Sequence, residues 1–176
     1  MQNVVKYKYV ERKVICVLRK LLSKEECAEC KICCGFNSSD IWEAPVITKE
    51  KSAEIISKYN PEQKFLQKED YCILHMPKEQ DKDLYFCTML DHNKGCVMGD
   101  NKPFDCKIWP FRVMNLNKTL VITLSPVCPV VQKRTLESIT EVAHELAPVI
   151  FAQADKTPQI VKPYINGYPI LAVKEN

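Results

Sequence analysis

Cysteine is the residue type through which this chain of 176 residues could perform chemistry, since it contains ten of them. Four lie in the dense run Cys27-x-x-Cys30-x-x-Cys33-Cys34. Thiolates bind soft or borderline metals such as zinc, copper(I) and the iron of iron–sulfur clusters. A two-residue spacer lets successive sulfurs converge on one centre within a turn of chain. The run therefore indicates a metal site rather than a disulfide scaffold.

Two kinds of metal centre fit this run. Cys-x2-Cys-x2-Cys is the spacing of bacterial ferredoxin-type clusters, in which a further cysteine is followed by proline. Cys128-Pro129 supplies such a pair, although about a hundred residues later. Structural zinc sites more often use two separated Cys-x2-Cys pairs. The triplet with its adjacent fourth cysteine favours an iron–sulfur cluster, and zinc stays as the alternative.

A second, widely spaced group of cysteines follows as Cys87-x8-Cys96-x9-Cys106, with Cys128 further along. A glycine directly before Cys96 and a proline three residues before Cys106 are turn residues that could bend this segment around a metal. With the dense run, this makes eight cysteines, the number that two four-cysteine clusters need. Because the two groups could interleave, their spacing does not assign ligands to each centre.

Together, the two groups resemble the CxxCxxCC, or YkgJ-like, family of zinc- or iron-chelating domains. Cys87-Thr-Met-Leu, Gly95-Cys96 and Lys102-Pro-Phe-Asp-Cys106-Lys-Ile-Trp-Pro-Phe are similar to the family's second block, which runs roughly C-x-x-L, G-x-C and R-P-x-x-C-R-x-x-P-F. Cys128-Pro129 is like the Cys-Pro that often closes the pattern. The resemblance covers about residues 27–130. Two lysines, Lys102 and Lys107, stand where arginines are usual, so the charge is kept but the bidentate fork is lost.

Such a resemblance implies a cysteine-ligated cluster protein of a bacterium or archaeon. The implied ligands are Cys27, Cys30, Cys33, Cys34, Cys87, Cys96, Cys106 and Cys128. Because the family includes flagellin lysine-N-methylase, it implies either redox or methyltransferase-like activity. We expect two [4Fe–4S] clusters in an electron-transfer or enzyme-accessory protein, with a redox protein or an enzyme as partner. The alternatives are a cluster-dependent enzyme with an open iron, and a zinc-stabilised interaction module. No catalytic residue, substrate or oligomeric state follows from the sequence.

Several residues near these blocks have simpler roles. Cys16 lies in an apolar stretch and Cys72 between apolar neighbours, so both are expected to be small buried side chains, with a spare ligand as the alternative for Cys72. His92 sits in a polar Asp-His-Asn turn, and metal ligation is its alternative. Trp109, which follows the last cysteine of the second group closely, is expected to shield a cluster from water.

The composition excludes several classes of protein. Lys plus Arg total 25 and Asp plus Glu total 22, and this net charge of +3 is too small to indicate nucleic-acid binding. No run approaches the roughly 18 apolar residues of a membrane helix, and the polar, basic N-terminus has no secretory h-region. We therefore expect a cytoplasmic protein without membrane contact. Neither G-x-G-x-x-G, Walker A, G-x-S-x-G, H-E-x-x-H nor the C-x3-C-x2-C spacing of radical-SAM enzymes occurs.

Short helices are expected to position the cysteines. Ser23 and Glu26 fit a capping box, which predicts that a helix starts there. This helix would place Cys27, Cys30 and Cys34 on one face and would end at Gly35. Thr48 can cap a second helix, whose core-facing residues are Ile55, Ile56 and Tyr59. A third helix is expected over residues 132–153, kinked or ended by Pro148, and its apolar side consists of Leu136, Ile139, Val142, Ala143 and Leu146.

Between these helices the sequence predicts short strands. Residues 71–74 and 84–87 could pair as one hairpin, and residues 111–114 and 119–124 as a second one. Residues 170–173 could add a further strand. The prediction is therefore an α+β fold in which short helices and β-hairpins are organised around cysteine-ligated metal clusters.

One domain is expected over residues 1–176. A basic element at residues 1–24 precedes the family-like core at about 27–130, and a helix and tail at 131–176 follow it. Residues 1–24 hold seven basic residues and one acid, a charge of +6, which leaves −3 for the rest. This element is expected to pack on the core with a solvated basic face. The alternative is a docking surface for an acidic partner or nucleic acid.

Overall fold

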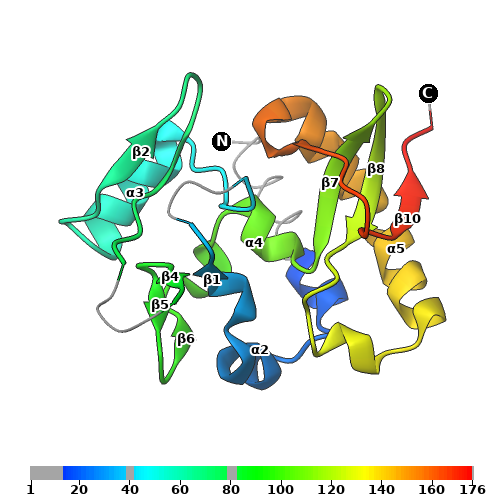
Figure 1. The fold of residues 1–176 in the computed structure, drawn as a ribbon, viewed down its shortest axis with the longest axis horizontal. Coiled ribbons are helices and arrows are strands. Elements are labelled where there is room, and N and C mark those ends of the chain that lie inside the picture. Colours follow the sequence, from blue (N-terminus) through cyan, green and yellow to red (C-terminus); the bar gives the residue numbers. More distant parts are fainter. Residues whose placement is uncertain (1–13, 39–41, 79–82, 176) are drawn as a thin grey trace.

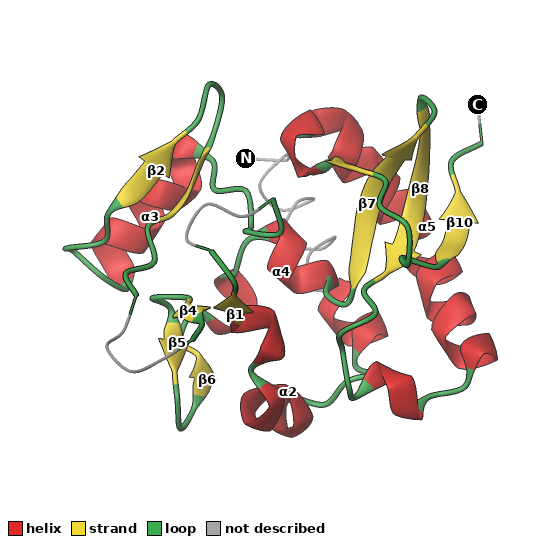
Figure 2. Cartoon of the chain, viewed as in Figure 1, coloured by secondary structure: helices red, strands yellow, loops and turns green. Residues whose placement is uncertain are grey.

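The computed structural model describes residues 14–38, 42–78 and 83–175, so the basic element at 1–24 falls partly outside the described residues. The fold is α+β, as the sequence predicts, and helices and small sheets alternate along the chain (Figures 1 and 2). Residues 14–18 are helical. The α-helices that follow are α2 (Lys24–Cys30), α3 (Lys49–Lys58), α4 (Phe104–Ile108) and α5 (Leu136–Lys156). Short 3₁₀ turns occupy Ile32–Cys34, Gly99–Asn101, Val131–Lys133 and Pro158–Ile160.

The largest sheet has four strands in the order β10-β8-β7-β9. These strands are β7 (Phe111–Leu116), β8 (Thr119–Leu124), β9 (Lys162–Pro163) and β10 (Ile170–Val173). The hairpin β7–β8 is the predicted one, and its two-residue turn places Asn117 and Lys118 at φ 50° and 71°. Two positive φ angles give the turn twist that matches paired strands. The predicted strand at 170–173 is also confirmed.

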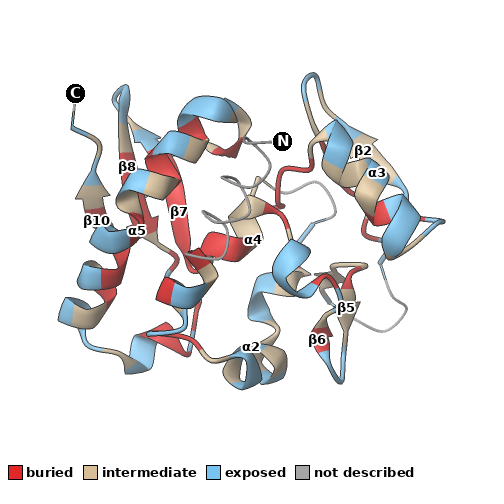
Figure 3. Cartoon of the chain, turned by 180° about the vertical axis from the view of Figure 1, so that it is seen from behind, coloured by how far each residue is buried: buried red, intermediate tan, exposed pale blue. Residues whose placement is uncertain are grey.

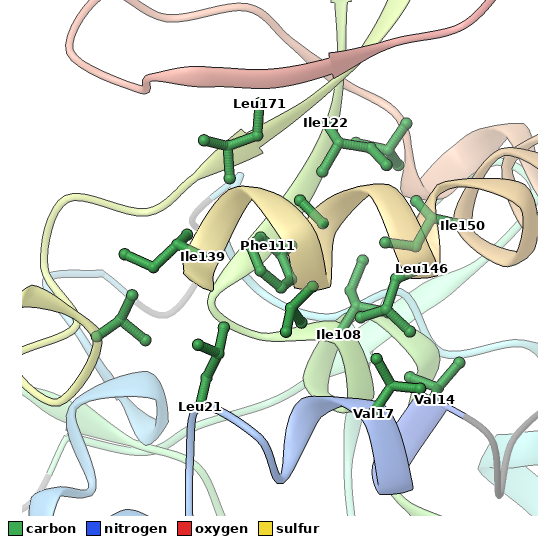
Figure 4. Packing of buried hydrophobic residues seen from close by; sticks show 14 of the residues in the cluster. Val14, Val17, Leu21, Ile108, Phe111, Ile122, Ile139, Leu146, Ile150 and Leu171 are labelled. Atoms are coloured by element: carbon green, nitrogen blue, oxygen red, sulfur yellow. The ribbon is translucent and has the colours of Figure 1, made fainter. Parts of the chain in front are cut away.

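Helix α5 covers this sheet and supplies much of the larger apolar core (Figure 4). Thr135 caps it by accepting a hydrogen bond from the Ser138 N–H. Its buried residues are Ile139, Val142, Ala143, Leu146, Ile150, Phe151 and Ala154. Of the two predicted effects of Pro148, a kink or an end of the helix, the second does not occur, since α5 continues to Lys156. Burial of Ile150 and Phe151 beyond it contributes about 1.5–3 kcal/mol each, enough to offset the roughly 3 kcal/mol cost of an interior proline.

A second, smaller core lies on the other side of the molecule, among α3 and the short strands (Figures 1 and 3). These strands pair antiparallel as β1 (Gly35–Phe36) with β4 (Tyr85–Phe86), β2 (Phe65–Gln67) with β3 (Cys72–Leu74), and β5 (Leu90–Asp91) with β6 (Gly95–Cys96). The predicted cap of α3 is present, since Thr48 Oγ1 accepts from the Lys51 N–H. The buried residues of this smaller core are Phe36, Ala44, Ile47, Ile55, Cys72, Ile73, Leu74, Met76, Met89 and Met98.

Two predictions about local structure are wrong, and both concern the segments that carry cysteines. Helix α2 ends at Cys30, because Lys31 adopts a left-handed conformation (φ 55°) and its N–H caps the helix at Cys27 O. Cys34 therefore does not share the face of α2. The hairpin between 71–74 and 84–87 does not form either. Its two segments pair with β2 and with β1, because each finds a partner that extends an apolar surface.

Single residues also depart from the helical pattern. Cys16 is exposed rather than buried, while Cys72 is buried as expected. Ile56 and Leu136 are exposed, whereas Ile55 is fully buried. The exposed residues Cys16, Ile56 and Leu136 lie at the border of an apolar stripe, where periodicity alone does not decide burial. Among the described residues, no helix is long and apolar enough to cross a membrane.

We expect Leu146→Ala and Leu136→Ala to differ strongly in their effect on stability. Leu146 is fully buried in the larger core, so its truncation should lower the free energy of unfolding by about 2–5 kcal/mol. Leu136 is 66% exposed at the first turn of α5, and its truncation should change stability by no more than about 0.5 kcal/mol. Denaturant titration followed by circular dichroism measures both, and equal losses would contradict the packing described above.

Candidate metal centre

The eight cysteines singled out by the sequence lie on segments at the junction of the two cores. Cys27 and Cys30 are on α2, and Cys33 and Cys34 are in the 3₁₀ turn that follows it. The other four lie directly after β4, at the end of β6, within α4 and after β8; they are Cys87, Cys96, Cys106 and Cys128. All ten cysteines of the chain are free thiols.

Four thiols from α2, the 3₁₀ turn and the segment after β8 form a first thiol set, consisting of Cys27, Cys30, Cys33 and Cys128. Cys27 interacts electrostatically with the other three members. Cys128 interacts in turn with Cys30 and Cys33. Residues 95 positions apart or more are thus brought together, as the predicted Cys-Pro closure requires.

The remaining four thiols form a second thiol set, consisting of Cys34, Cys87, Cys96 and Cys106. Pairing of β1 with β4 brings Cys87 to Cys34, and the Cys87 N–H donates to Cys34 O at 2.8 Å. Cys34 interacts with Cys87 and Cys96, and Cys106 interacts with Cys34 and Cys96. The dense run is therefore shared between both sets, an interleaving that spacing left open.

The two sets touch at the neighbours Cys33 and Cys34, whose Sγ atoms are 3.9 Å apart. Cys33 also interacts with Cys106, so it lies closest to the boundary between the sets. The left-handed residue Lys31 makes this possible, because it ends α2 and turns the chain before Cys33. One turn of chain thereby contributes a thiol to each set.

Each set is held against a different apolar core. Cys128 is buried in the larger core, and Cys30 packs on it. Cys87 and Cys96 pack on the smaller core. The thiols therefore lie where the two cores meet.

An inner cavity of about 60 Å³ lies beside the second thiol set, whose four thiols all line it together with Cys33. Apolar side chains form much of its wall, among them Leu74, Met89, Met98 and Trp109. Arg112 also reaches it. The four thiols of the second set thus share one cavity, and within it Cys34 and Cys87 also hydrogen-bond to each other.

Arg112 is a site residue that the sequence did not reveal. Its guanidinium lies between two indoles, 5.4 Å from Trp42 and 5.1 Å from Trp109, and it donates to Glu43 O at 3.2 Å. Its Nε is buried without a hydrogen-bond partner among the described residues. A single arginine within a strand gives no periodic signal of burial, so only tertiary structure identifies it. Buried donors of this kind call for an acceptor.

Burial and mutual interaction raise the pKa of Cys27, Cys34 and Cys106. Burial, followed by the charge of Cys33, raises the pKa of Cys27 to about 11. For Cys34, the hydrogen bond from Cys33 lowers the pKa, but the hydrogen bond with Cys87 and burial together raise it to about 12. Burial also raises the pKa of Cys106 well above its ordinary value. Without a metal, these groups are protonated at neutral pH, which argues against a nucleophilic cysteine and means that metal binding releases protons.

A network at the start of α2 fixes the first thiol set to α5. The predicted capping box forms, since Ser23 Oγ accepts from the Glu26 N–H and Glu26 Oε2 accepts from the Ser23 N–H. Arg134 donates to Leu21 O at 2.9 Å and to Glu26 Oε1 at 2.8 Å. The Ser23 N–H, and then Arg134, hold the pKa of Glu26 below its ordinary value. This network orients the helix that carries Cys27.

Within residues 14–38, 42–78 and 83–175, no three His, Cys, Asp or Glu side chains are placed so that they could hold a metal ion. The donor chemistry nevertheless fits clusters, because both sets consist entirely of thiols and each contains four. His92 remains in the β5–β6 turn, where its carbonyl accepts from Lys31 Nζ. No protein-family model, curated protein or solved structure matches the chain.

We expect Cys128→Ala and Cys106→Ala each to remove one centre and to leave the other. Each substitution takes one thiol from a different set, and loss of one of four ligands leaves a centre under-coordinated. Cys16→Ala, on an exposed thiol outside both sets, is the control and should keep the full metal content. Iron, zinc and sulfide analysis of the three purified variants measures this, and equal metal loss in all three would contradict the division into sets.

Proposed function

We propose that the chain is an iron–sulfur protein that carries two [4Fe–4S] clusters and transfers electrons, alone or as the accessory of an enzyme. The observation that carries this proposal is the division of eight thiols into two sets of four. We also propose that it is a cytoplasmic member of the YkgJ-like family. Its free thiols suit a reducing compartment.

A bound cluster would supply one-electron chemistry, and the chain's own residues would tune it. The first thiol set would ligate one cluster and the second set the other. Trp109 and the apolar wall of the inner cavity would exclude water from the second cluster. The buried Arg112 would place positive charge beside it. Burial and nearby charge are the levers by which proteins set cluster potentials.

Zinc is the alternative that one distance favours. Two thiolates on one tetrahedral zinc are separated by about 3.8 Å, as follows from Zn–S bonds of about 2.3 Å. The Cys33–Cys34 separation of 3.9 Å would suit such a pair. If Cys33 and Cys34 instead ligate two different clusters, their short separation would mark the point where the two clusters lie next to each other. An enzyme with an open cluster iron is the further alternative.

We expect anaerobically purified protein to contain roughly eight iron ions and eight acid-labile sulfide ions per chain, because each set of four thiolates would hold one [4Fe–4S] cluster. It should be brown, with broad visible absorption. Stoichiometric zinc without labile sulfide would contradict the proposal and favour the zinc-stabilised module.

We also expect the two cores to differ in stability once the clusters are removed. The larger core holds α5, β7 and β8 and should stay protected, whereas the smaller core depends on thiols for its attachment. Hydrogen exchange before and after chelation and oxygen exposure would measure this. Protection should fall mainly in residues 34–98 and persist in 139–154. Unchanged protection in both regions would show that the clusters do not support the fold.

A further inference from the structure

An outer hollow of about 270 Å³ adjoins the inner cavity, and Cys33, Cys34, Cys96 and Cys106 line both. Among the described residues that line the outer hollow, six are cationic and one is acidic. These residues are Arg19, Lys24, Lys31, Lys94, Lys102 and Lys107, with Asp100 as the acid. The lining therefore carries +5, whereas the whole chain carries +3, which leaves −2 for everything else. Residues 1–13 carry a further +3 in the sequence, so positive charge is concentrated at the hollow and in this N-terminal stretch, and the remainder of the chain is acidic.

The cations of the hollow lie at two depths. Lys102 is half-buried, and its charge acts on the thiols of Cys27 and Cys33. Arg19, Lys24 and Lys94 are exposed, and none of them has an ion-pair partner within the described part of the chain. The charge of Lys102 can therefore offset thiolate charge. Arg19, Lys24 and Lys94 face the solvent, where a ligand or a partner protein can reach them.

These exposed cations come together because α2 lies against β6. Close packing at Gly95, where an added Cβ would lie 3.3 Å from Ala28, fixes the β5–β6 turn beside the helix. Both elements lie at the same edge of the molecule in opposite views (Figures 1 and 3). Lys24 and Lys94 thereby flank the hollow in which Cys27 and Cys33, the exposed members of the first thiol set, are found.

We infer that this cationic face, formed by Arg19, Lys24, Lys31, Lys94 and Lys102, docks an acidic electron-carrier protein. The inference rests on the proposed function. One electron passes between a cluster beside the hollow and the carrier, so that one is oxidised as the other is reduced, and no bond forms or breaks. An acidic surface complements the face, and complementary charge accelerates encounter by about 10–10³-fold at low salt. Both thiol sets line the hollow, the first through Cys27 and Cys33 and the second through Cys34, Cys96 and Cys106.

The test compares two double variants of the intact, cluster-loaded protein. Lys24→Glu with Lys94→Glu reverses charge at the face, and the first residue of α2 tolerates glutamate well. Lys64→Glu with Lys118→Glu is the matched control on exposed lysines of other elements. Each pair changes the net charge from +3 to −1, so any difference between them reports position rather than total charge. Lys31 is left intact because it donates to His92 O.

Stopped-flow oxidation of the reduced protein should be followed with ferricyanide, with hexaammineruthenium(III) and with an acidic ferredoxin. We expect the face variant to react about tenfold more slowly than the control with ferricyanide and the ferredoxin at low ionic strength, and faster with the cationic complex. These differences should vanish near 0.5 M salt, where charges are screened within a few ångströms.

The outcomes separate the two claims. Loaded clusters with equal rates in both double variants would overturn the docking face and leave the proposed function standing. Protein without iron and sulfide would overturn both. Tight binding of a single-stranded oligonucleotide at about 0.15 M salt, lost in the face variant alone, would overturn the carrier in favour of nucleic acid.

Discussion

The structure depends on one constraint, namely that eight thiols occupy the junction between two apolar cores. Cys30 and Cys128 belong to the larger core and Cys87 and Cys96 to the smaller one. Tyr71 packs on both. Thiols are weak hydrogen-bond partners, so thiol contacts alone contribute little to a junction. The proposed clusters would add bonds between the segments that meet there.

A short turn of backbone decides how the thiols divide. Had α2 continued through residue 34, its cysteines would lie on one face and serve one centre. Lys31 instead adopts φ 55°, and the 3₁₀ turn then directs Cys33 and Cys34 to different sets. Pairing of β1 with β4 completes the second set by placing Cys87 beside Cys34. The separation into two sets is therefore a property of local backbone geometry, and the two sets necessarily adjoin.

Sequence patterns predicted what is local and missed what is not. The capping box at Ser23, the β7–β8 hairpin and the apolar stripe of α5 follow from periodicity and turn chemistry, and each is present. The partners of β3 and β4 are set by long-range pairing, which short motifs do not encode. The cysteines could be singled out by type and spacing. Their assignment to sets could not, because it depends on a left-handed lysine that no propensity anticipates.

The two sets differ in the side chains around them, and this distinguishes the two proposed clusters. Cys27 and Cys33 of the first set are exposed beside the cationic face. The second set lines the inner cavity together with apolar side chains and Arg112, which is held between two indoles, and Cys34, Cys96 and Cys106 also line the outer hollow. Buried positive charge stabilises the reduced, more negative state of a cluster, whereas solvent access brings in counter-ions and water. On this reasoning either proposed cluster would exchange electrons at the cationic face, and Arg112 would favour the reduced state of the one held by the second set.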